Sequence, residues 1–386
     1  MRLHWIDALK GIGIILVVFA HHSLPVALDT YIFSFHMPLF FFISGFLFDF
    51  GKYAESAANF VKGRFRSLIV PYFCFAVLTC LFYFLLDTAF QPEVTNIKFF
   101  EASAVYGIYS IIYALGPLVS YNPPLWFLTC LFVTELLFYR FAKKYYGEPR
   151  KLVLWLTAAG VIGYLYSVYV PFRLPWNADV ALSAVVFYGA GNLFRKIIEP
   201  KKESRVEPEA KSGSGAFLEA DSKFRKGISR VEKFFPGIFL LLNLLYLGYL
   251  LEFPTTDKVN MNVLKYGGFF SYYLLAFSGI FAFVYLFKKV GSSKILEYYG
   301  KNSLIVLALH FPIKDIMAKL VVIILGIDIE YFYYNAAFAL SLTVLNLLCL
   351  IPVIFLINNY FPFLIGKKGS STEFEGLKAR FRKFVS

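Results

Sequence analysis

Long apolar runs alternate with short polar connections along the whole chain. Ten of the runs approach or exceed the roughly 20 residues that cross a bilayer as a helix. They cover approximately residues 9–28, 31–50, 67–88, 123–142, 152–170, 179–198, 235–252, 268–288, 303–325 and 332–358. The pattern predicts an all-α integral membrane protein, a bundle of about ten transmembrane helices.

Two connections are longer than the rest. Residues 199–234 are charged and contain SGSG, which predicts a flexible cytoplasmic linker within one transmembrane domain of residues 1–366. Residues 89–122 hold an interrupted apolar stretch, FFEASAVYGIYSIIYALG, which favours an interfacial or re-entrant segment on the outer side. The tail, 367–386, contains KARFRKF and is typical of a basic amphipathic helix on the inner leaflet.

Composition and charge support this picture and orient it. The 386 residues are 59% hydrophobic and 16% charged, with a net charge of +13. With both termini in the cytoplasm, 32 of the 38 Lys and Arg residues fall in cytoplasmic segments. This asymmetry follows the positive-inside rule and explains the positive charge without a nucleic-acid partner. We expect a multi-pass protein of the inner, cytoplasmic membrane, in contact with membrane lipids.

Ionisable residues inside apolar runs are costly and are therefore candidates for function. They are His21, His22, His36, Glu135 and His310. At about 1.5 Å per residue, His21, His36, Glu135 and His310 all lie near the middle third of their spans. One shared polar pocket is the prediction. Histidine can act there as a general base or a nucleophile, although a buried histidine is also a common structural donor. The spacing of the histidines and cysteines favours no metal site.

The first span places a cation on the same face as a histidine. Lys10 and His21 are eleven residues apart, about three helical turns. Such a face suits an anionic ligand that enters from the cytoplasm, with its phosphates near Lys10. Alternatively, Lys10 marks only the membrane boundary.

Two prolines follow histidines inside the predicted spans. Pro38 and Pro312 should each free a helix carbonyl, that of Ser34 and that of Ala308. Ser44-Gly45 permits a close approach of either a ligand or a neighbouring helix. The segment KGRFRSLIVPY offers cations that either clamp phosphates or flank the membrane on the positive side.

Five segments together resemble a known family. They are DALKGIGIILVVFAHH, FSFHMPLFFFISGF, KGRFRSLIVPY, NPPLWFL and GKNSLIVLALHFPI, in this order. The chain is similar to the acyltransferase 3 family of ten-span membrane acyltransferases, and most closely to its fucose 4-O-acetylase-like branch. The resemblance implies transfer of an acetyl group from cytoplasmic acetyl-CoA, as co-substrate and without a metal, to a hydroxyl of a cell-surface glycan or its lipid-linked precursor.

The resemblance also implies roles for individual residues. His21 would be catalytic, with His36 as its partner. Glu135, a catalytic candidate because it lies inside a span, would help to orient His21 or the sugar. Acetyl-CoA would bind at Lys10, Arg64, Arg66, Ser44 and Gly45, and the acceptor at Trp126, His310 and Asn122. The family often carries Arg-x-x-Arg before the third span; here Arg64 matches the first arginine, but Ser67 stands at the second and Arg66 one place earlier.

An O-acetyltransferase is therefore the predicted function, and a multi-span transporter or flippase for glycans or lipid-linked sugars is the alternative. No inverted repeat of motifs is visible, which counts against a transporter. The sequence leaves open the acceptor and its hydroxyl, the acyl chain length, the choice between direct transfer and an acyl-histidine, and the oligomeric state.

Overall fold

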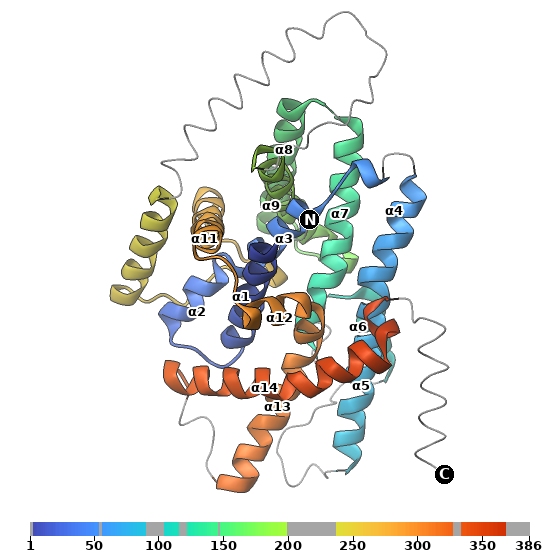
Figure 1. Ribbon diagram of the computed structural model, residues 1–386, viewed down its shortest axis with the longest axis vertical. Helices are drawn as coiled ribbons and strands as arrows, with labels where there is room; N and C mark the ends of the chain where they lie inside the picture. Colours follow the sequence, from blue (N-terminus) through green and yellow to red (C-terminus); the bar gives the residue numbers. More distant parts are fainter. Residues whose placement is uncertain are drawn as a thin grey trace, which may run out of the picture.

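The computed structural model describes residues 3–53, 56–89, 104–115, 122–145, 147–198, 237–326 and 333–367 (Figure 1). Regular structure in these ranges is helical, and they contain no strand. The helices are α1 (His4–Ala20), α2 (Val26–Phe33), α3 (His36–Leu47), α4 (Ala57–Arg64), α5 (Val70–Ala89), α6 (Ala104–Tyr113), α7 (Trp126–Lys144), α8 (Pro149–Tyr169), α9 (Ala178–Ile198), an unlabelled helix Gly237–Glu252, α11 (Phe269–Val290), α12 (Lys294–Lys301), α13 (Ser303–Leu325) and α14 (Ala336–Tyr360).

Each of the ten predicted spans overlaps one of these helices or helix pairs. Within the described ranges, six segments are long and apolar enough to cross a membrane: Val26–Leu47, Ala57–Leu85, Pro123–Lys144, Pro149–Tyr169, Phe269–Val290 and Ala336–Tyr360. The structure therefore supports a multi-pass, all-helical protein. The count of ten and the cytoplasmic position of both termini stay predictions.

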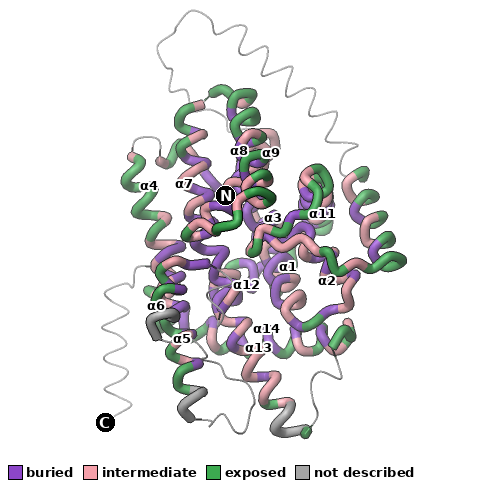
Figure 2. The backbone as a smooth tube through the Cα atoms, turned by 180° about the vertical axis from the view of Figure 1, so that it is seen from behind, coloured by how far each residue is buried: buried purple, intermediate pink, exposed green. Residues whose placement is uncertain are grey.

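Buried residues gather in the middle of the molecule, where α1, α3, α7 and α9 meet (Figure 2). The peripheral helices expose large apolar side chains instead, such as Leu81 on α5, Leu154 on α8 and Leu245 on Gly237–Glu252. A soluble protein rarely exposes so much apolar surface along whole helices, but a surface in contact with lipid does.

The first helix differs from the predicted span 9–28. It begins at His4 and ends at Ala20, because Ser23 has a positive φ of 50° and Leu24 precedes Pro25, which disfavours helical backbone. His21 consequently occupies the C-cap position of α1. The predicted mid-helix histidine is thus a helix-terminal one.

The second span is a broken helix. The helical backbone is interrupted at Ser34 and Phe35, so His36 is the first residue of α3. Pro38 then lies in the first turn of α3, where a backbone N–H would have no helical partner. Pro38 lies inside the candidate span Val26–Leu47, as predicted, but in the first turn of α3 and not within a continuous helix.

The third span contains one π-helical turn. The helix α4 ends at Arg64, the turn Phe65–Ile69 follows, and α5 continues through Pro71. The Val70 N–H donates to the Phe65 carbonyl, one residue further back than in an α-helix. Because Pro71 cannot donate to Ser67, the sequence favours this wider turn.

Two helix pairs touch backbone to backbone. A Cβ on Gly45 of α3 would lie 1.8 Å from the Tyr188 carbonyl oxygen of α9, and one on Gly191 would lie 1.9 Å from the Phe42 oxygen. On α1, a Cβ on Gly11 would lie 2.0 Å from the Leu296 oxygen of α12. These positions tolerate glycine alone, and the two pairs are the most extensive helix contacts of the described fold.

Three predicted segments lie wholly or partly outside the described residues. The linker 199–234 lies outside them, as does the tail beyond Lys367. Of the outer segment 89–122, the structure describes the helix α6, whose ten residues are too few to span a membrane. Tyr72 of α5 donates a hydrogen bond to the Ile111 carbonyl of α6, at 2.8 Å.

Candidate active site

The imidazole of His21 is fixed by its own helix. Its Nδ1 lies 2.7 Å from the Val17 carbonyl oxygen, four residues back. The terminal carbonyls of a helix have no helical donor, so a side chain that donates there satisfies one of them. The bond places the N–H on Nδ1 and leaves a lone pair on Nε2.

Two further histidines adopt the same arrangement. Nδ1 of His36 lies 2.7 Å from the Ile32 carbonyl oxygen, and Nδ1 of His310 lies 2.9 Å from that of Val306. Each therefore carries its proton on Nδ1, like His21. A shared tautomer leaves three Nε2 lone pairs available for proton transfer or hydrogen bonding.

The structure brings these histidines together. The ring centres of His21 and His310 are 5.0 Å apart, in an edge-to-face arrangement, and Phe311 lies 5.9 Å from His21. His36 and His310 also both interact electrostatically with His21. Two helices near the N-terminus, α1 and α3, and the distant α13 thus supply one cluster of imidazoles.

Asn122 connects this cluster to the start of α7. Its amide nitrogen donates to the Ala308 carbonyl at 2.9 Å and to the Thr79 hydroxyl at 3.0 Å. Pro312 leaves the Ala308 carbonyl without a helical donor, as the sequence predicts, and Asn122 supplies the missing bond. Trp126, the first residue of α7, follows one turn later and is buried.

Several polar atoms around His310 have no partner. In the described part of the chain, Nε2 of His310 and the amide oxygens of Asn122 and Asn346 are buried and bond to nothing. Asn346 of α14 donates to the His310 carbonyl at 2.9 Å. Native proteins satisfy most buried polar atoms, so these three atoms call for partners such as water or the polar groups of a ligand.

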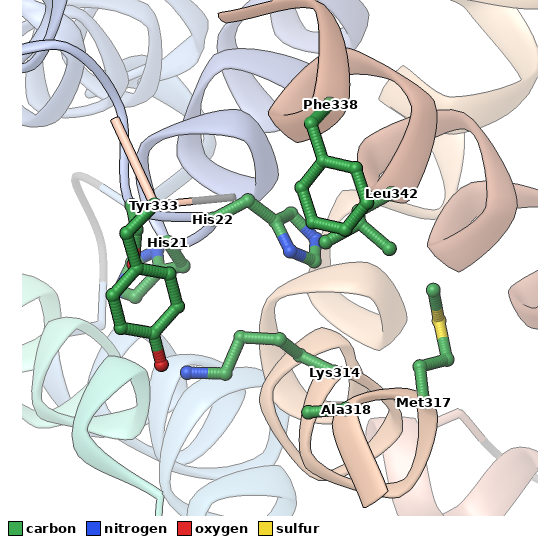
Figure 3. A pocket seen from close by; sticks show the side chains of 9 residues that line it. His21, His22, Lys314, Met317, Ala318, Tyr333, Phe338 and Leu342 are labelled. Atoms are coloured by element: carbon green, nitrogen blue, oxygen red, sulfur yellow. The ribbon is translucent and has the colours of Figure 1, made fainter. Parts of the chain in front are cut away.

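A pocket opens beside His21 (Figure 3). Its empty space amounts to about 470 Å³, part of it continuous with the exterior. It is lined by His21, His22, Ser23, Lys314, Met317, Ala318, Tyr333, Phe338 and Leu342. These residues come from the end of α1, the middle of α13 and the start of α14, so the pocket lies at the opposite end of α1 from Lys10.

Glu135 lies in a different cluster. Its carboxylate oxygen Oε2 is 3.0 Å from Arg64 Nε, and Oε1 accepts a hydrogen bond from the Tyr188 hydroxyl at 3.4 Å. The Glu135 side chain is buried, whereas Arg64 is partly exposed. The structure therefore pairs two residues to which the sequence gives separate roles, and none of these contacts involves a histidine.

The remaining predicted residues lie along the α1, α3 and α4 segments. Lys10 is half-buried on α1, which is unbroken up to Ala20, so Lys10 and His21 are about 16 Å apart along the helix. Gly45 packs directly on α9, which favours the helix-packing interpretation. Ser44 is half-buried beside it, and Arg66 lies within the π-helical turn.

Three polar residues of the two clusters have no role in the sequence prediction. Lys314 lines the pocket, Asn346 bonds the backbone of α13, and Tyr188 bonds Glu135. A signal existed for Lys314, because it follows His310 by four residues and shares its helix face. The described residues contain no group of three or more His, Cys, Asp or Glu side chains that could hold a metal ion.

Comparison with known proteins identifies the family. The family model Acyl_transf_3, described as an acyltransferase domain, matches residues 3–365. No protein of curated function and no solved structure matches the chain. The match covers the histidine cluster, the pocket and the Arg64–Glu135 pair, and it runs through nearly the whole sequence. The chain therefore belongs to the acyltransferase 3 family of membrane acyltransferases.

Proposed function

We propose that the protein transfers an acetyl group from cytoplasmic acetyl-CoA to a hydroxyl of a cell-surface glycan or of its lipid-linked precursor. The observation that carries the proposal is the fixed tautomer of His21 at the wall of a pocket. A histidine base needs a free ring nitrogen, a defined orientation and access to the hydroxyl. Membership of an acyltransferase family favours group transfer over the alternative, transport.

His21 has the chemistry of a general base. Nε2 takes the hydroxyl proton as the acceptor oxygen attacks the thioester carbonyl; the C–O bond forms, the C–S bond breaks, and the imidazolium returns the proton to the CoA sulfur. Val17 keeps Nδ1–H engaged throughout. The same Nε2 can instead attack the thioester itself, which would give an acyl-imidazole that a later hydroxyl resolves.

The donor would approach from the Lys10 end of α1. CoA carries several phosphates, and Lys10 together with the partly exposed Arg64 offers cations to them. The guanidinium of Arg64 contacts Glu135 through Nε, so its two terminal nitrogens remain for a bidentate phosphate contact. We propose Arg66 as a secondary contact, since it lies one residue from the family position. A role for Ser44 and Gly45 would be to let the backbone of α3 approach the pantetheine arm.

The acceptor would approach from the pocket. In this proposal Trp126, Asn122 and His310 contact the sugar, and the orphaned oxygen of Asn122 accepts one of its hydroxyl protons. His36 would help to orient His21. The cell envelope, and the inner membrane in particular, is the location that this reaction requires.

The experiment compares the wild type with His21→Ala, each purified in detergent. Binding of acetyl-CoA and release of CoA are measured, with His4→Ala as the matched control because it removes a histidine from the other end of the same helix. We expect all three proteins to bind acetyl-CoA, and only His21→Ala to lose CoA release. If the wild type does not bind acetyl-CoA at millimolar concentration, the donor assignment is wrong.

A further inference from the structure

The pocket beside His21 has two chemically different sides (Figure 3). The ammonium of Lys314 and the hydroxyl of Tyr333 lie on one side, and Met317, Phe338 and Leu342 form an apolar wall on the other, with the His22 ring beside Phe338 and Leu342. A fully polar sugar chain needs no apolar wall, and a purely apolar ligand needs no ammonium group. The division indicates a ligand that carries both an anion and a hydrocarbon part.

Lys314 is the cation of this pocket, and its charge is only loosely neutralised. The ammonium lies 4.0 Å from the centre of the Phe311 ring and 3.5 Å from the Asp315 carboxylate. Asp315 meanwhile accepts a hydrogen bond from the Tyr83 hydroxyl at 2.6 Å, so its charge is shared. A lysine within an apolar helix is costly and is therefore a candidate for ligand binding.

Lys314 is close enough to His21 to act on the same ligand. Both lie beside the Phe311 ring, the ammonium at 4.0 Å and the imidazole centre at 5.9 Å from its centre. They are therefore at most about 10 Å apart. One sugar ring with an attached phosphate can bridge this distance. Lys314 also interacts electrostatically with His21, His22 and His310.

The apolar wall continues out of the pocket along α14. Phe338 and Leu342 line the pocket, and Leu345 and Cys349 follow on the same face at helical spacing, both exposed. This stripe belongs to a helix long and apolar enough to span the membrane. A hydrocarbon chain in the pocket can therefore leave along α14 into the surrounding lipid.

We infer that the pocket binds an acceptor in which a sugar is joined through phosphate to a long apolar chain. Lys314 binds the phosphate, the sugar hydroxyl reaches Nε2 of His21, and the chain follows Phe338 and Leu342 out of the pocket. Lys314 is then the residue that selects a lipid-linked acceptor over a free polysaccharide. The inference rests on the proposed function and names the acceptor class for it.

The first experiment measures binding of undecaprenyl phosphate to the purified protein in nanodiscs. Undecaprenol, which lacks the phosphate, and phosphatidylglycerol, an ordinary anionic lipid, are the comparison ligands. We expect undecaprenyl phosphate to bind more tightly than both, and Lys314→Ala to weaken it by about tenfold or more, the loss of one charge-assisted contact. Lys314→Arg should retain binding. Lys319→Ala is the matched control, since it removes a lysine of α13 that does not line the pocket.

Equal binding of undecaprenol or of phosphatidylglycerol would overturn the inference, as would unchanged binding by Lys314→Ala. The second experiment supplies radiolabelled acetyl-CoA to membranes that contain the protein. We expect label in the organic extract, released into water when mild acid cleaves the sugar–phosphate bond; label confined to water-soluble polymer overturns the inference. Absence of acetyl-CoA binding would instead refute the proposed function. The two outcomes are distinguishable because binding of undecaprenyl phosphate is measured without acetyl-CoA.

Discussion

The bond between Asn122 and the Ala308 carbonyl makes a quantitative prediction about Pro312. Ala308 and Asn122 are fully buried, so Asn122→Ala leaves the carbonyl oxygen without a donor or water. Leaving a buried carbonyl without a hydrogen-bond donor lowers the unfolding free energy by about 1–3 kcal/mol. Thr79 adds little to this cost, because its hydroxyl still donates to the Phe75 carbonyl at 2.7 Å.

Replacement of the proline should remove most of that cost. In Pro312→Ala the residue gains a backbone N–H that can donate to Ala308 within α13. Asn122→Ala should then be cheaper in this background by about 1–2 kcal/mol, a coupling between two residues that share one acceptor. The sign is definite: the double variant is more stable than the sum of the single effects predicts.

The assay is a double-mutant cycle. Unfolding free energies are measured in mixed micelles of dodecyl maltoside and sodium dodecyl sulfate, and unfolding is followed by circular dichroism. Pro352→Ala is the matched control, because Pro352 is also inside a helix but is on α14, away from Asn122. If Asn122→Ala lowers the unfolding free energy equally in the wild-type and Pro312→Ala backgrounds, within about 0.5 kcal/mol, the hydrogen bond to the Ala308 carbonyl is not the source of the stabilisation by Asn122.

Three further changes have definite expected outcomes. Gly45→Ala should lower stability by about 2 kcal/mol or more in thermal melts, because the added Cβ meets a backbone oxygen. Gly63→Ala is the control: a Cβ there has no neighbour within 4 Å, so the change should be neutral or slightly stabilising. Glu135→Gln should raise the KM for acetyl-CoA more than it lowers kcat, since Arg64 loses its anchor; the reverse split would refute this. Hydrogen bonds from Lys301 and neighbours lower the pKa of Glu297 to about 2. Glu297→Gln should therefore lower the unfolding free energy by its full amount above pH 4.5. The difference between wild type and variant should shrink as the pH falls towards 2.

The sequence predicts the membrane class and the approximate position of the long apolar helices, because hydrophobic length is a local property. It also predicts that Pro312 frees a carbonyl, since that follows from the chemistry of one residue. The break at Ser34 and Phe35 was not predicted. The break involves local hydrogen bonds, such as that from the Ser34 hydroxyl to the Tyr31 carbonyl at 2.7 Å. The apolar run in the sequence gives no sign of them.

Long-range partners account for most of what the sequence could not predict. Arg64 and Glu135 are 71 positions apart, and nothing in either segment indicates that one ion pair joins them. The approach of His21 to His310 followed from comparing depths along helices, but the pocket depends on Lys314 and on the start of α14. Side-chain contacts between distant helices determine those features, and hydrophobic periodicity carries no information on them.

The glycine contacts have a mechanical consequence. Where a carbonyl oxygen contacts a glycine Cα, one helix cannot slide along the other unless the two first separate. The pairs α3–α9 and α1–α12 should therefore each move as one rigid body. Motion that admits substrates is then left to helices joined through flexible side chains, such as α13 and α14 around Met317 and Leu342. A disulfide engineered between α3 and α9 should leave turnover intact, while one joining α13 to α14 across the pocket should stop it.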